Sequence, residues 1–389
     1  GMNMLAINGG RPMMMNLKEI IAAFIEFREE VIRRRTIFRL NKARNRAHVL
    51  VGLAIAVENL DEVIELIKTA PTPQDAKYSL VGKAWPAASI EDWVNLIDEP
   101  DRKVENGFYR LSDDQAKAIL DLKLQRLTGL ERDKIHDELV SLGEDIKEFL
   151  SIFLYRIGKS YWNKKHICLV SEKFASMAQD NGYYFFKHCM DENEEAYLNK
   201  KIYYIIAKDS PDHYKVDPYK KNVINFMSIR HMIYTQAADL IVSSDSRYHT
   251  YAMQCRHSIF NRYLRRKKFV FLQHGVIALK KVDNFYGKGM RGGCDLFVVS
   301  TNAEKQTIID YFGYEPDEVI NTGLPRWDVL KDHSQGTREI MIMPTWRNWL
   351  DSVPDKDFEE SEYFKHYMGL LNSSRFSQIL EKYDLQVNF

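Results

Sequence analysis

The chain has 389 residues, more than one ordinary domain needs, so two or three domains are expected. Hydrophobic residues make up 45% and charged residues 28%, the balance of a water-soluble protein, and the net charge of +1 excludes a general electrostatic attraction for nucleic acid or membrane. The four cysteines are too few for a disulfide framework and lack metal-ligand spacing, and no apolar run is long enough to span a membrane. A cytoplasmic protein without metal or cofactor is expected.

The first region is helical. From residue 16 to about residue 69, apolar residues recur at helical spacing, which predicts an antiparallel coiled coil or a helical arm. Thr72 before Pro73 is typical of an N-cap followed by the first helical residue. Ser89 with Asp92 predicts another helix start, and residues 100–110 are expected to form a polar loop.

A capping box, Ser112 with Gln115, predicts a helix over residues 113–127. Thr128 with Glu131 predicts a new helix that runs to about Phe153. The apolar stripe on these helices needs a partner surface and therefore predicts a dimer. Its members are Ile119, Leu122, Leu124, Leu127 and Leu130.

This region resembles a known family in three pieces: MNLKEIIAAFIEFREEVIRRRTIFRLNKARNRAHVL, APTPQDAKYSLV and YRLSDDQAKAILDLKLQRLTGLERDKIHDEL. They are similar to the tower region of bacterial DNA gyrase A, over about residues 7–152. The resemblance implies a coiled-coil arm, a dimerisation gate at about residues 109–142 and a homodimer. The family's catalytic tyrosine lies upstream of this region, so DNA cleavage is not expected. The basic residues between 28 and 46 are interpreted as a solvated helix face, and DNA is an unlikely partner.

The composition changes near Tyr155, where aromatic residues become frequent. Short apolar runs then alternate with helical patterns, which predicts a doubly wound parallel sheet. The predicted strands are 166–171, 202–207, 222–225, 240–243, 269–272, 296–300 and 318–321. After a linker at 331–337, the runs 340–343 and 385–389 predict two strands of a second α/β lobe. The expected domains are therefore 1–152, 153–335 and 336–389.

The stretch KFVFLQHGV, residues 268–276, ends an apolar strand in Gln273, His274 and Gly275. In open α/β sheets the chemistry lies at the carboxyl ends of the strands. Gly275 is expected to allow a tight turn that leaves His274 at a crevice. Because imidazole titrates near neutral pH, His274 is a candidate general base. The alternative is a histidine whose hydrogen bonds are satisfied at the end of a strand.

Six further pieces carry a second resemblance: LVSEKFASMAQDNGYYFFKH, YYIIAKDSPDHYKV, FLQHGV, FVVSTNAEKQTIIDYFGY, VINTGLPRWDVL and IMIMPTWRNW. In this order they resemble the CDP-glycerol glycerophosphotransferases, the teichoic-acid and capsule polymerase family. The resemblance, over about residues 155–389, implies a glycosyltransferase-B-like fold of two lobes. It also implies a CDP-glycerol or related CDP-alditol donor and transfer of glycerol phosphate to a hydroxyl of a growing polyanionic polymer. His274 matches the family's catalytic histidine. The family's second lobe continues past PTWR, so an incomplete lobe and little turnover are expected of this sequence.

Charge that develops on the donor pyrophosphate needs hydrogen-bond donors in fixed geometry. Arg326 in GLPR and Arg347 in PTWR are candidates for bidentate contacts, with salt bridges to Asp328 and Asp351 as the alternatives. Ser300 and Thr301 precede a predicted helix and form either an anion site or plain N-caps. The remaining candidates for donor and phosphate binding are Gly275, Gly323, which permits close backbone approach, and Thr345.

Several other features have two interpretations. The basic run 265–268, with Lys280 and Lys281, predicts attraction for a polyanionic acceptor or for the inner face of a membrane, with a solvated loop as the commoner explanation. Residues 180 and 181 are interpreted as a turn, and His231, His249 and His257 receive no role. Two alternative functions for the whole chain are a gyrase-related dimerisation module without catalysis and a scaffold protein without activity.

Overall fold

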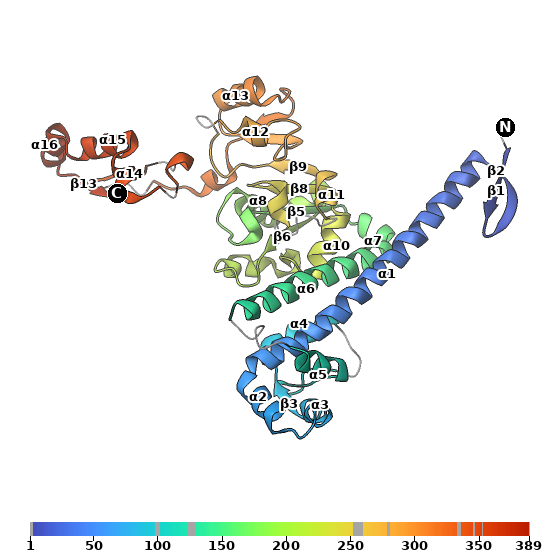
Figure 1. Ribbon diagram of the computed structural model, residues 1–389. Coiled ribbons are helices and arrows are strands. Elements are labelled where there is room, and N and C mark those ends of the chain that lie inside the picture. The colour runs from blue at the N-terminus through green and yellow to red at the C-terminus, as the bar shows by residue number, and fades with distance from the viewer. Residues whose placement is uncertain are drawn as a thin grey trace. The chain divides into compact units, whose positions relative to one another are not determined.

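The computed structural model describes residues 3–97, 102–122, 129–251, 260–277, 281–332, 336–344, 347–351 and 353–388. The chain forms two compact units, Gly1–Asp328 and Val329–Phe389. Figure 1 shows the helices of the first region and the sheet that follows them. Within the described ranges, no helix is both long enough and apolar enough to cross a membrane.

The chain begins with an antiparallel hairpin that sequence analysis did not predict. Strand β1 (Asn3–Asn8) pairs with β2 (Arg11–Asn16) in continuous register. Gly9 and Gly10 both have positive φ, 60° and 78°, as a two-residue hairpin turn of this kind requires. The missed signal was therefore the Gly-Gly pair between two runs of six residues.

The expected long helical stretch is divided at Asn59 into α1 (Leu17–Glu58) and α2 (Leu60–Thr69). Helix α3 (Pro73–Gly82) begins as predicted, because Thr72 accepts a hydrogen bond from the backbone N–H of Asp75 and Pro73 is the first helical residue.

A helical segment begins at this point, as Ser89 and Asp92 predicted, but Ser89 is not its cap. Ser89 lies inside a 3-10 turn, η1 (Ala88–Ile90), and its hydroxyl donates to the carboxylate of Glu58, so it does not cap helix α4 (Glu91–Ile97). The expected polar loop also contains a short strand. That strand, β4 (Phe108–Arg110), pairs with β3 (Ala84–Pro86), and both are too short to show a recognisable alternation of apolar and polar residues.

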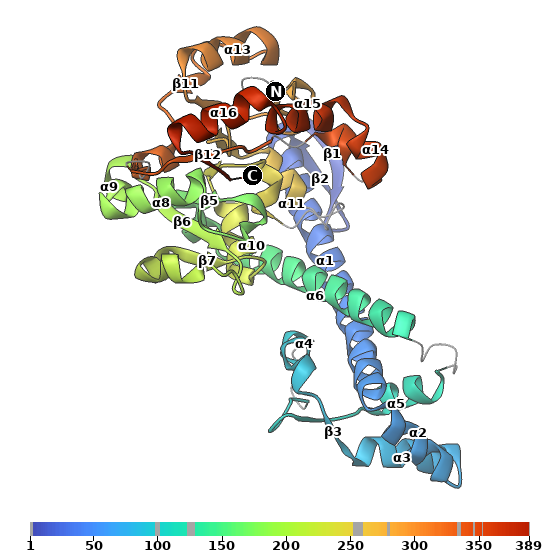
Figure 2. The same cartoon turned by 90° about the vertical axis from the view of Figure 1, so that its left-hand side faces the viewer.

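The capping box of Ser112 and Gln115 is confirmed at the start of α5 (Asp113–Leu120). Helix α6 (Gly129–Ile157) follows, and it packs against α1 as Figures 1 and 2 both show. Ile119, the first member of the predicted dimer stripe, is buried in the core of this chain. Leu124, Leu127 and Thr128 lie outside the described residues, as does the side chain of Leu130.

Helix α6 continues into the following α/β region. Ile152 is 6% exposed and packs with the core of the sheet, beside Met232 and Tyr251. The hydroxyl of Tyr251 donates to Glu148 of α6 at 2.7 Å. The last turns of α6 are therefore part of the core that supports the sheet.

We expect Ile152→Ala to lower the free energy of unfolding by about 2–4 kcal/mol, because it removes buried methyl groups and leaves a cavity. Urea unfolding followed by circular dichroism measures the change. Ile157→Ala on the same helix is the matched control, since Ile157 is 72% exposed, and we expect a change within about 0.5 kcal/mol. Equal effects of the two substitutions would contradict the packing of Ile152 in this core.

The α/β region contains a sheet of seven strands in which every neighbouring pair is parallel, in the order β11-β10-β9-β8-β5-β6-β7. All seven predicted strands are present, with ends within two residues of the prediction. Their bounds are β5 (Ile167–Ser171), β6 (Lys201–Ile206), β7 (Val223–Asn225), β8 (Leu240–Ser243), β9 (Lys268–Phe271), β10 (Leu296–Val299) and β11 (Val319–Asn321).

Helices cover both faces of this sheet because successive strand residues point to opposite sides. Cys168 and Val170 of β5 pack with α8 (Asn181–Asp191), whereas Ile167 and Leu169 pack with α10 (Ile229–Ala237). Helix α13 (Asn302–Phe312) covers β10 and β11. The shorter helices of this region are α7 (Lys159–Asn163), α9 (Glu194–Leu198), α11 (Phe260–Arg265) and α12 (Asp283–Tyr286).

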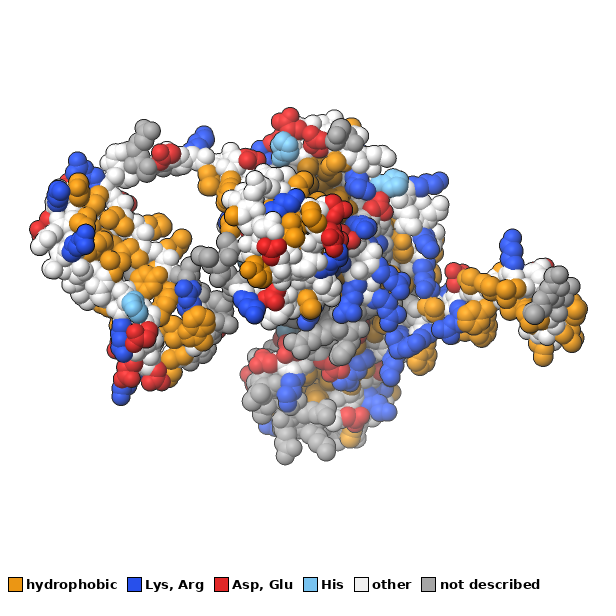
Figure 3. Space-filling model, turned by 90° about the horizontal axis from the view of Figure 1, so that it is seen from above, with side chains coloured by type: hydrophobic (Ala, Val, Ile, Leu, Met, Phe, Trp, Pro, Cys, Tyr) orange, Lys and Arg blue, Asp and Glu red, His pale blue; other side chains and the backbone are white. Residues whose placement is uncertain are grey.

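The second unit contains the two predicted strands, β12 (Glu339–Met341) and β13 (Gln386–Asn388), which pair in parallel. Helices α14 (Asp355–Glu359), α15 (Glu362–Leu371) and α16 (Ser374–Tyr383) lie between them in the chain. None of the side chains described in this unit is buried. Figure 3 shows apolar side chains on its surface, and Trp349 is 69% exposed.

Candidate functional site

The strand order reverses between β5 and β8, which are neighbours at the centre of the sheet. In open α/β sheets, ligands bind in the crevice outside the carboxyl ends of the strands at this switch point. A cavity of about 690 Å³ lies there. Its lining residues are Glu172, Lys173, Ser176, Met177, Gln179, Asp180, Asp245, His249, His274, Phe285, Tyr286 and Arg326. Among the side chains that the structure describes, no three from His, Cys, Asp or Glu are grouped closely enough to hold a metal ion.

His274 lines this cavity and is exposed, as its place after β9 suggested. The tight turn was predicted at Gly275, but the left-handed residue is Gln273, with φ of 59°. A left-handed non-glycine residue is strained and persists only where its surroundings hold it. The buried Gln273 side chain donates to the carbonyl of Val298 at 2.6 Å, and the backbone carbonyl of Gln273 accepts from Nδ2 of Asn181 at 2.7 Å. These contacts hold the turn that presents His274.

A buried glutamate, Glu304, makes further hydrogen bonds with the same turn. Its carboxylate accepts from the side chain of Gln273 and from the backbone N–H of Ile277. It also accepts from the backbone N–H and the hydroxyl of Ser300, at 2.7 and 2.8 Å. Thr301 caps helix α13 by accepting from the N–H of Glu304. Thr301 is thus a plain N-cap, as one alternative expected, whereas Ser300 is not a cap and binds Glu304 instead. Neither residue lines the cavity, and a phosphate role for them stays a prediction.

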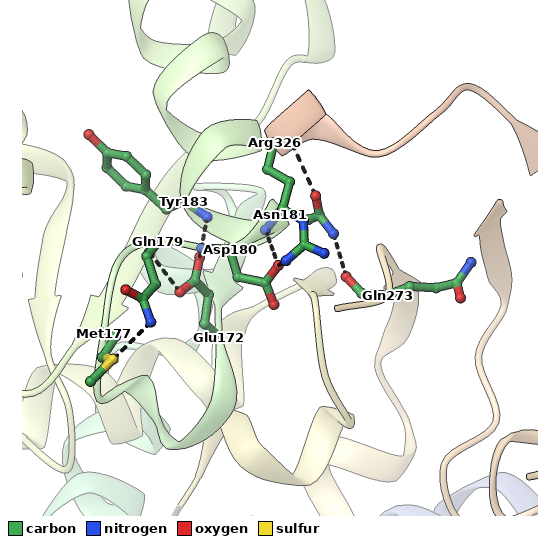
Figure 4. A network of polar contacts seen from close by, with 8 residues as sticks. All are labelled: Glu172, Met177, Gln179, Asp180, Asn181, Tyr183, Gln273 and Arg326. Atoms are coloured by element: carbon green, nitrogen blue, oxygen red, sulfur yellow. Dashed lines mark hydrogen bonds and ion pairs between the residues drawn. The ribbon is translucent and has the colours of Figure 1, made fainter. Parts of the chain in front are cut away.

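Arg326 reaches the cavity from the 3-10 turn η6 (Pro325–Val329). Its guanidinium lies 3.2 Å from Oδ1 of Asp180, so its ion pair is with Asp180 and not with the expected alternative, Asp328. Asn181 accepts from the backbone N–H of Arg326 at 3.0 Å and donates to the carbonyl of Gln273. Figure 4 shows Asn181 between these two residues. Residues 180 and 181, which were predicted to form a turn, are instead the N-cap and the first residue of α8, and they join the segments that carry His274 and Arg326.

Glu172 follows β5 and is 3% exposed. Its carboxylate accepts from the backbone N–H groups of Gln179, Asp180 and Tyr183, between 2.7 and 3.1 Å (Figure 4). Burial raises the pKa of Glu172 to about 7 and outweighs these donors, which favour the ionised form. The carboxylate thus occupies the backbone donors at the start of α8.

The raised pKa of Glu172 predicts a dependence of stability on pH. In an unfolded chain a glutamate titrates near 4.3, so the folded state binds this proton more tightly. Its contribution to stability is complete below about pH 4.3 and is lost as pH rises through about 7. Relative to Glu172→Gln, the wild-type free energy of unfolding should fall by up to ~1.4 kcal/mol per pH unit across this window.

Urea unfolding of both proteins at a series of pH values tests this expectation. Glu192→Gln is the control for loss of a glutamate charge, because Glu192 is an exposed residue at the other end of α8. If the free energy of unfolding of the wild type instead rose with pH relative to Glu172→Gln, the three backbone donors would lower the pKa of Glu172 more than burial raises it.

Sequence analysis missed a second histidine in the cavity. Nδ1 of His249 lies 3.1 Å from Oδ2 of Asp245, and both residues follow β8. Although burial opposes it, the neighbouring His249 holds the pKa of Asp245 below its usual range, and His274 adds to this effect. Asp245 is thus an ionised carboxylate within electrostatic reach of both histidines. A signal was present in the polar run that ends strand 240–243, SSDS, but nothing in the sequence placed it beside 268–276.

His231, another histidine without a predicted role, does not line the cavity. His231 is buried in the core, where burial lowers its pKa to about 4, and its Nδ1 accepts from the backbone N–H of Met227. His257 lies outside the described residues.

One further predicted residue of the first unit, Gly323, is not part of the cavity lining. Gly323 has φ of 80° and no atom near the position of a Cβ, so it is needed for its left-handed backbone and not for the close approach that was expected. Arg347 belongs to the second unit and lies over the rings of Trp349 and Tyr363, at 5.8 and 5.3 Å. Thr345 lies outside the described residues.

The basic run at residues 265–268 is largely engaged within the chain. Arg265 donates to the hydroxyl of Tyr248, and Lys267 donates to the carbonyl of Gln236 at 2.6 Å. Lys268 pairs with Asp295 at 3.1 Å. These contacts give the run a structural role, while Lys280 lies outside the described residues.

Comparison with known proteins separates the two halves of the chain. Residues 1–165 match the family model of the A subunits of DNA gyrase and topoisomerase IV. The DNA gyrase A protein of Granulibacter bethesdensis is 52% identical over 177 residues, which cover 45% of this chain and 19% of that protein. The Rickettsia felis protein of the same name is 46% identical over 176 residues, 45% of this chain and 19% of its own length. The Escherichia coli protein of the same name is 50% identical over 151 residues, 36% of this chain and 17% of its own length.

The chain therefore spans less than a fifth of these curated relatives, and a gyrase A-related segment is joined to a second protein. Residues 153–383, more than half of the chain, match the family model of CDP-Glycerol:Poly(glycerophosphate) glycerophosphotransferase. This match includes the seven-stranded sheet and every residue of the cavity. The chain is thus a chimera, and through residues 153–383 it belongs to the CDP-Glycerol:Poly(glycerophosphate) glycerophosphotransferase family.

Proposed function

We propose that residues 153–383 form a transferase domain that moves glycerol phosphate from CDP-glycerol to a hydroxyl of a glycerophosphate polymer. The observation that carries this proposal is the placement of His274 in the switch-point cavity on a strained turn that Asn181 and Glu304 hold. A strained turn held in this way is typical of a residue that must meet a reacting group. The family match supports the choice of donor and acceptor.

In the proposed reaction, the acceptor hydroxyl attacks the phosphorus atom that carries the glycerol. The new bond joins the acceptor oxygen to this phosphorus, and the bond from phosphorus to the bridging oxygen breaks, so that CMP leaves. The hydroxyl proton passes to His274, which acts as the general base. The guanidinium of Arg326 stabilises the charge that develops on the phosphoryl oxygens. No metal or cofactor enters this scheme.

Several finer predictions belong to the same proposal. They include the glycosyltransferase-B-like arrangement of two lobes, the domain limits at 152 and 335, and donor contacts by Gly275, Gly323, Thr345 and Arg347. A cytoplasmic location also belongs here, and it agrees with the free thiols of Cys168, Cys189 and Cys294.

Calorimetric titration of the chain with CDP-glycerol tests the proposal. We expect a saturable heat with one site per chain, and competition by CDP-ribitol if the site accepts related alditols. CMP is the control for the share of affinity that the nucleotide supplies. Absence of a saturable heat from folded protein would contradict the proposal.

For the gyrase-related segment we propose a dimerising role, through residues 113–142, within the coiled-coil arm that its resemblance implies. Light scattering at micromolar concentration should then give about twice the chain mass of 45.6 kDa. Leu122 is half-buried just after α5, and Leu122→Glu should weaken the dimer by placing a charge in the apolar stripe. A wild-type mass of a single chain would contradict this prediction.

A further inference from the structure

The cavity holds a second imidazole that the proposed reaction does not yet use. His249 and Asp245 form a pair on the segment that follows β8, directly at the switch point. The carboxylate of Asp245 is fixed, because it accepts from the backbone N–H of Ser246 at 2.6 Å while the backbone N–H of Asp245 donates to the hydroxyl of Ser243 at 3.1 Å. The ring of Phe174 lies 4.2 Å from the ring of His249, centroid to centroid. The imidazole is thus held by the Phe174 ring and by Asp245 at Nδ1.

The pairing determines which ring nitrogen is available to a ligand. Nδ1 of His249 is buried and lies 3.1 Å from Oδ2 of Asp245, within ion-pair distance but without the alignment of a hydrogen bond. When a carboxylate faces Nδ1, the proton of a neutral imidazole resides there and Nε2 carries the lone pair. Because the side chain is 15% exposed and lines the cavity, Nε2 is the nitrogen that a ligand can reach.

The carboxylate beside His249 favours an uncharged polyhydroxyl group there, whereas Lys173 and Arg326 are the cations of the cavity lining. The backbone donors at the start of α8, which would suit an anion, are occupied by Glu172 and Asp180. Asp245 adds an ionised carboxylate beside His249. A pyrophosphate at this place would meet like charge, whereas hydroxyl groups can donate to an imidazole nitrogen and to carboxylate oxygens.

We propose that Nε2 of His249 accepts a hydrogen bond from a hydroxyl of the terminal glycerol unit of the acceptor, next to the hydroxyl that His274 deprotonates. Asp245 is the positioning residue, since it fixes the tautomer and the orientation of the His249 ring. This inference rests on the proposed function of His274 and names the acceptor side of the same site. Two histidines would then hold the two ends of one glycerol unit.

Side-chain NMR of the whole chain, with selectively labelled histidine, tests the inference without turnover. The probe is sn-glycerol 3-phosphate, and His249→Gln and His274→Gln assign the two signals among the 11 histidines. We expect the probe to shift both signals with one shared Kd, and inorganic phosphate to leave the His249 signal unchanged. In Asp245→Asn, the ¹⁵N pattern of a proton on Nδ1 of His249 should be lost and the Kd should rise roughly 2- to 10-fold.

Three outcomes would overturn the inference: a His249 signal that stays fixed while His274 saturates, an equal shift with inorganic phosphate, and no shift of either signal. If Asp245→Asn does not fold, His249→Gln provides the same test, with the Kd read from the His274 signal. Failure of the proposed function gives a different result: CDP-glycerol does not bind, even if sn-glycerol 3-phosphate shifts the NMR signals of both histidines. A role for Asp245 in packing alone would alter folding but not the tautomer of His249.

Discussion

We expect His274→Ala to lower the rate constant of glycerol phosphate transfer by roughly 10²–10⁴-fold, the usual contribution of a positioned general base. Without the imidazole, the acceptor hydroxyl must lose its proton to water while it attacks phosphorus. The affinity for CDP-glycerol should change little, because the proposed scheme assigns the phosphates to Arg326 and not to His274. The substitution should also leave the fold intact, since the His274 side chain is exposed and Gln273 and Glu304 make the contacts that hold its turn.

His188→Ala is the matched control for this prediction, because His188 is an exposed histidine of α8 and does not line the cavity. Its transfer rate should equal that of the wild type. If His274→Ala, with folding confirmed by circular dichroism, also kept a rate near wild type, His274 would be a histidine satisfied at the end of a strand.

Whereas His274→Ala should change the rate, Arg326→Ala should change the affinity and raise the Kd of CDP-glycerol by about 10–100-fold. The expected loss corresponds to hydrogen bonds with a charged group, each of which contributes about 1.5–3 kcal/mol. The substitution also leaves the carboxylate of Asp180 without its cation, in a cavity where a phosphoryl group must approach. Calorimetry with CDP-glycerol measures the change.

Asp180→Asn distinguishes phosphate binding by Arg326 from a merely structural ion pair. It removes the ion pair but keeps the guanidinium, and the contact between Asn181 and the backbone N–H of Arg326 is independent of both side chains. If Arg326 binds phosphate, Asp180→Asn should bind CDP-glycerol at least as tightly as the wild type. A loss of affinity as large as that of Arg326→Ala would show that CDP-glycerol binding depends on the ion pair between Arg326 and Asp180 and not on a contact between Arg326 and phosphate.

The sheet could be predicted because each of its strands is a short apolar run bounded by polar residues. Runs such as 167–171 and 240–243 are buried on both faces, and their composition alone indicates that burial. The position of His274 followed from the same reasoning, since the end of a parallel strand at a switch point is a crevice.

The partners of His274 could not be predicted in the same way. Asp245 and His249 reach the cavity because β8 and β9 are neighbours, and Asn181 reaches Arg326 across 145 residues of chain. Such pairings depend on the strand order, which apolar runs do not reveal. The left-handed Gln273 was also missed, because glycine is the residue normally expected at such a position and Gly275 stood two residues away. The role of Glu172 was also missed. Nothing in the sequence distinguishes it from other polar residues, because the backbone N–H groups that bind its carboxylate have no sequence signature.

The central claim is that the cavity containing His274 catalyses glycerophosphate transfer, and a single-turnover assay tests it most directly. The chain is held in excess over CDP-glycerol labelled in its glycerol, with a short glycerophosphate polymer as acceptor, so that slow turnover still gives a signal. The account predicts that label passes to the polymer, that CMP forms in equal amount, and that His274→Ala slows both roughly 10²–10⁴-fold. Label that stays in the donor, or that moves equally fast with His274→Ala, would contradict it.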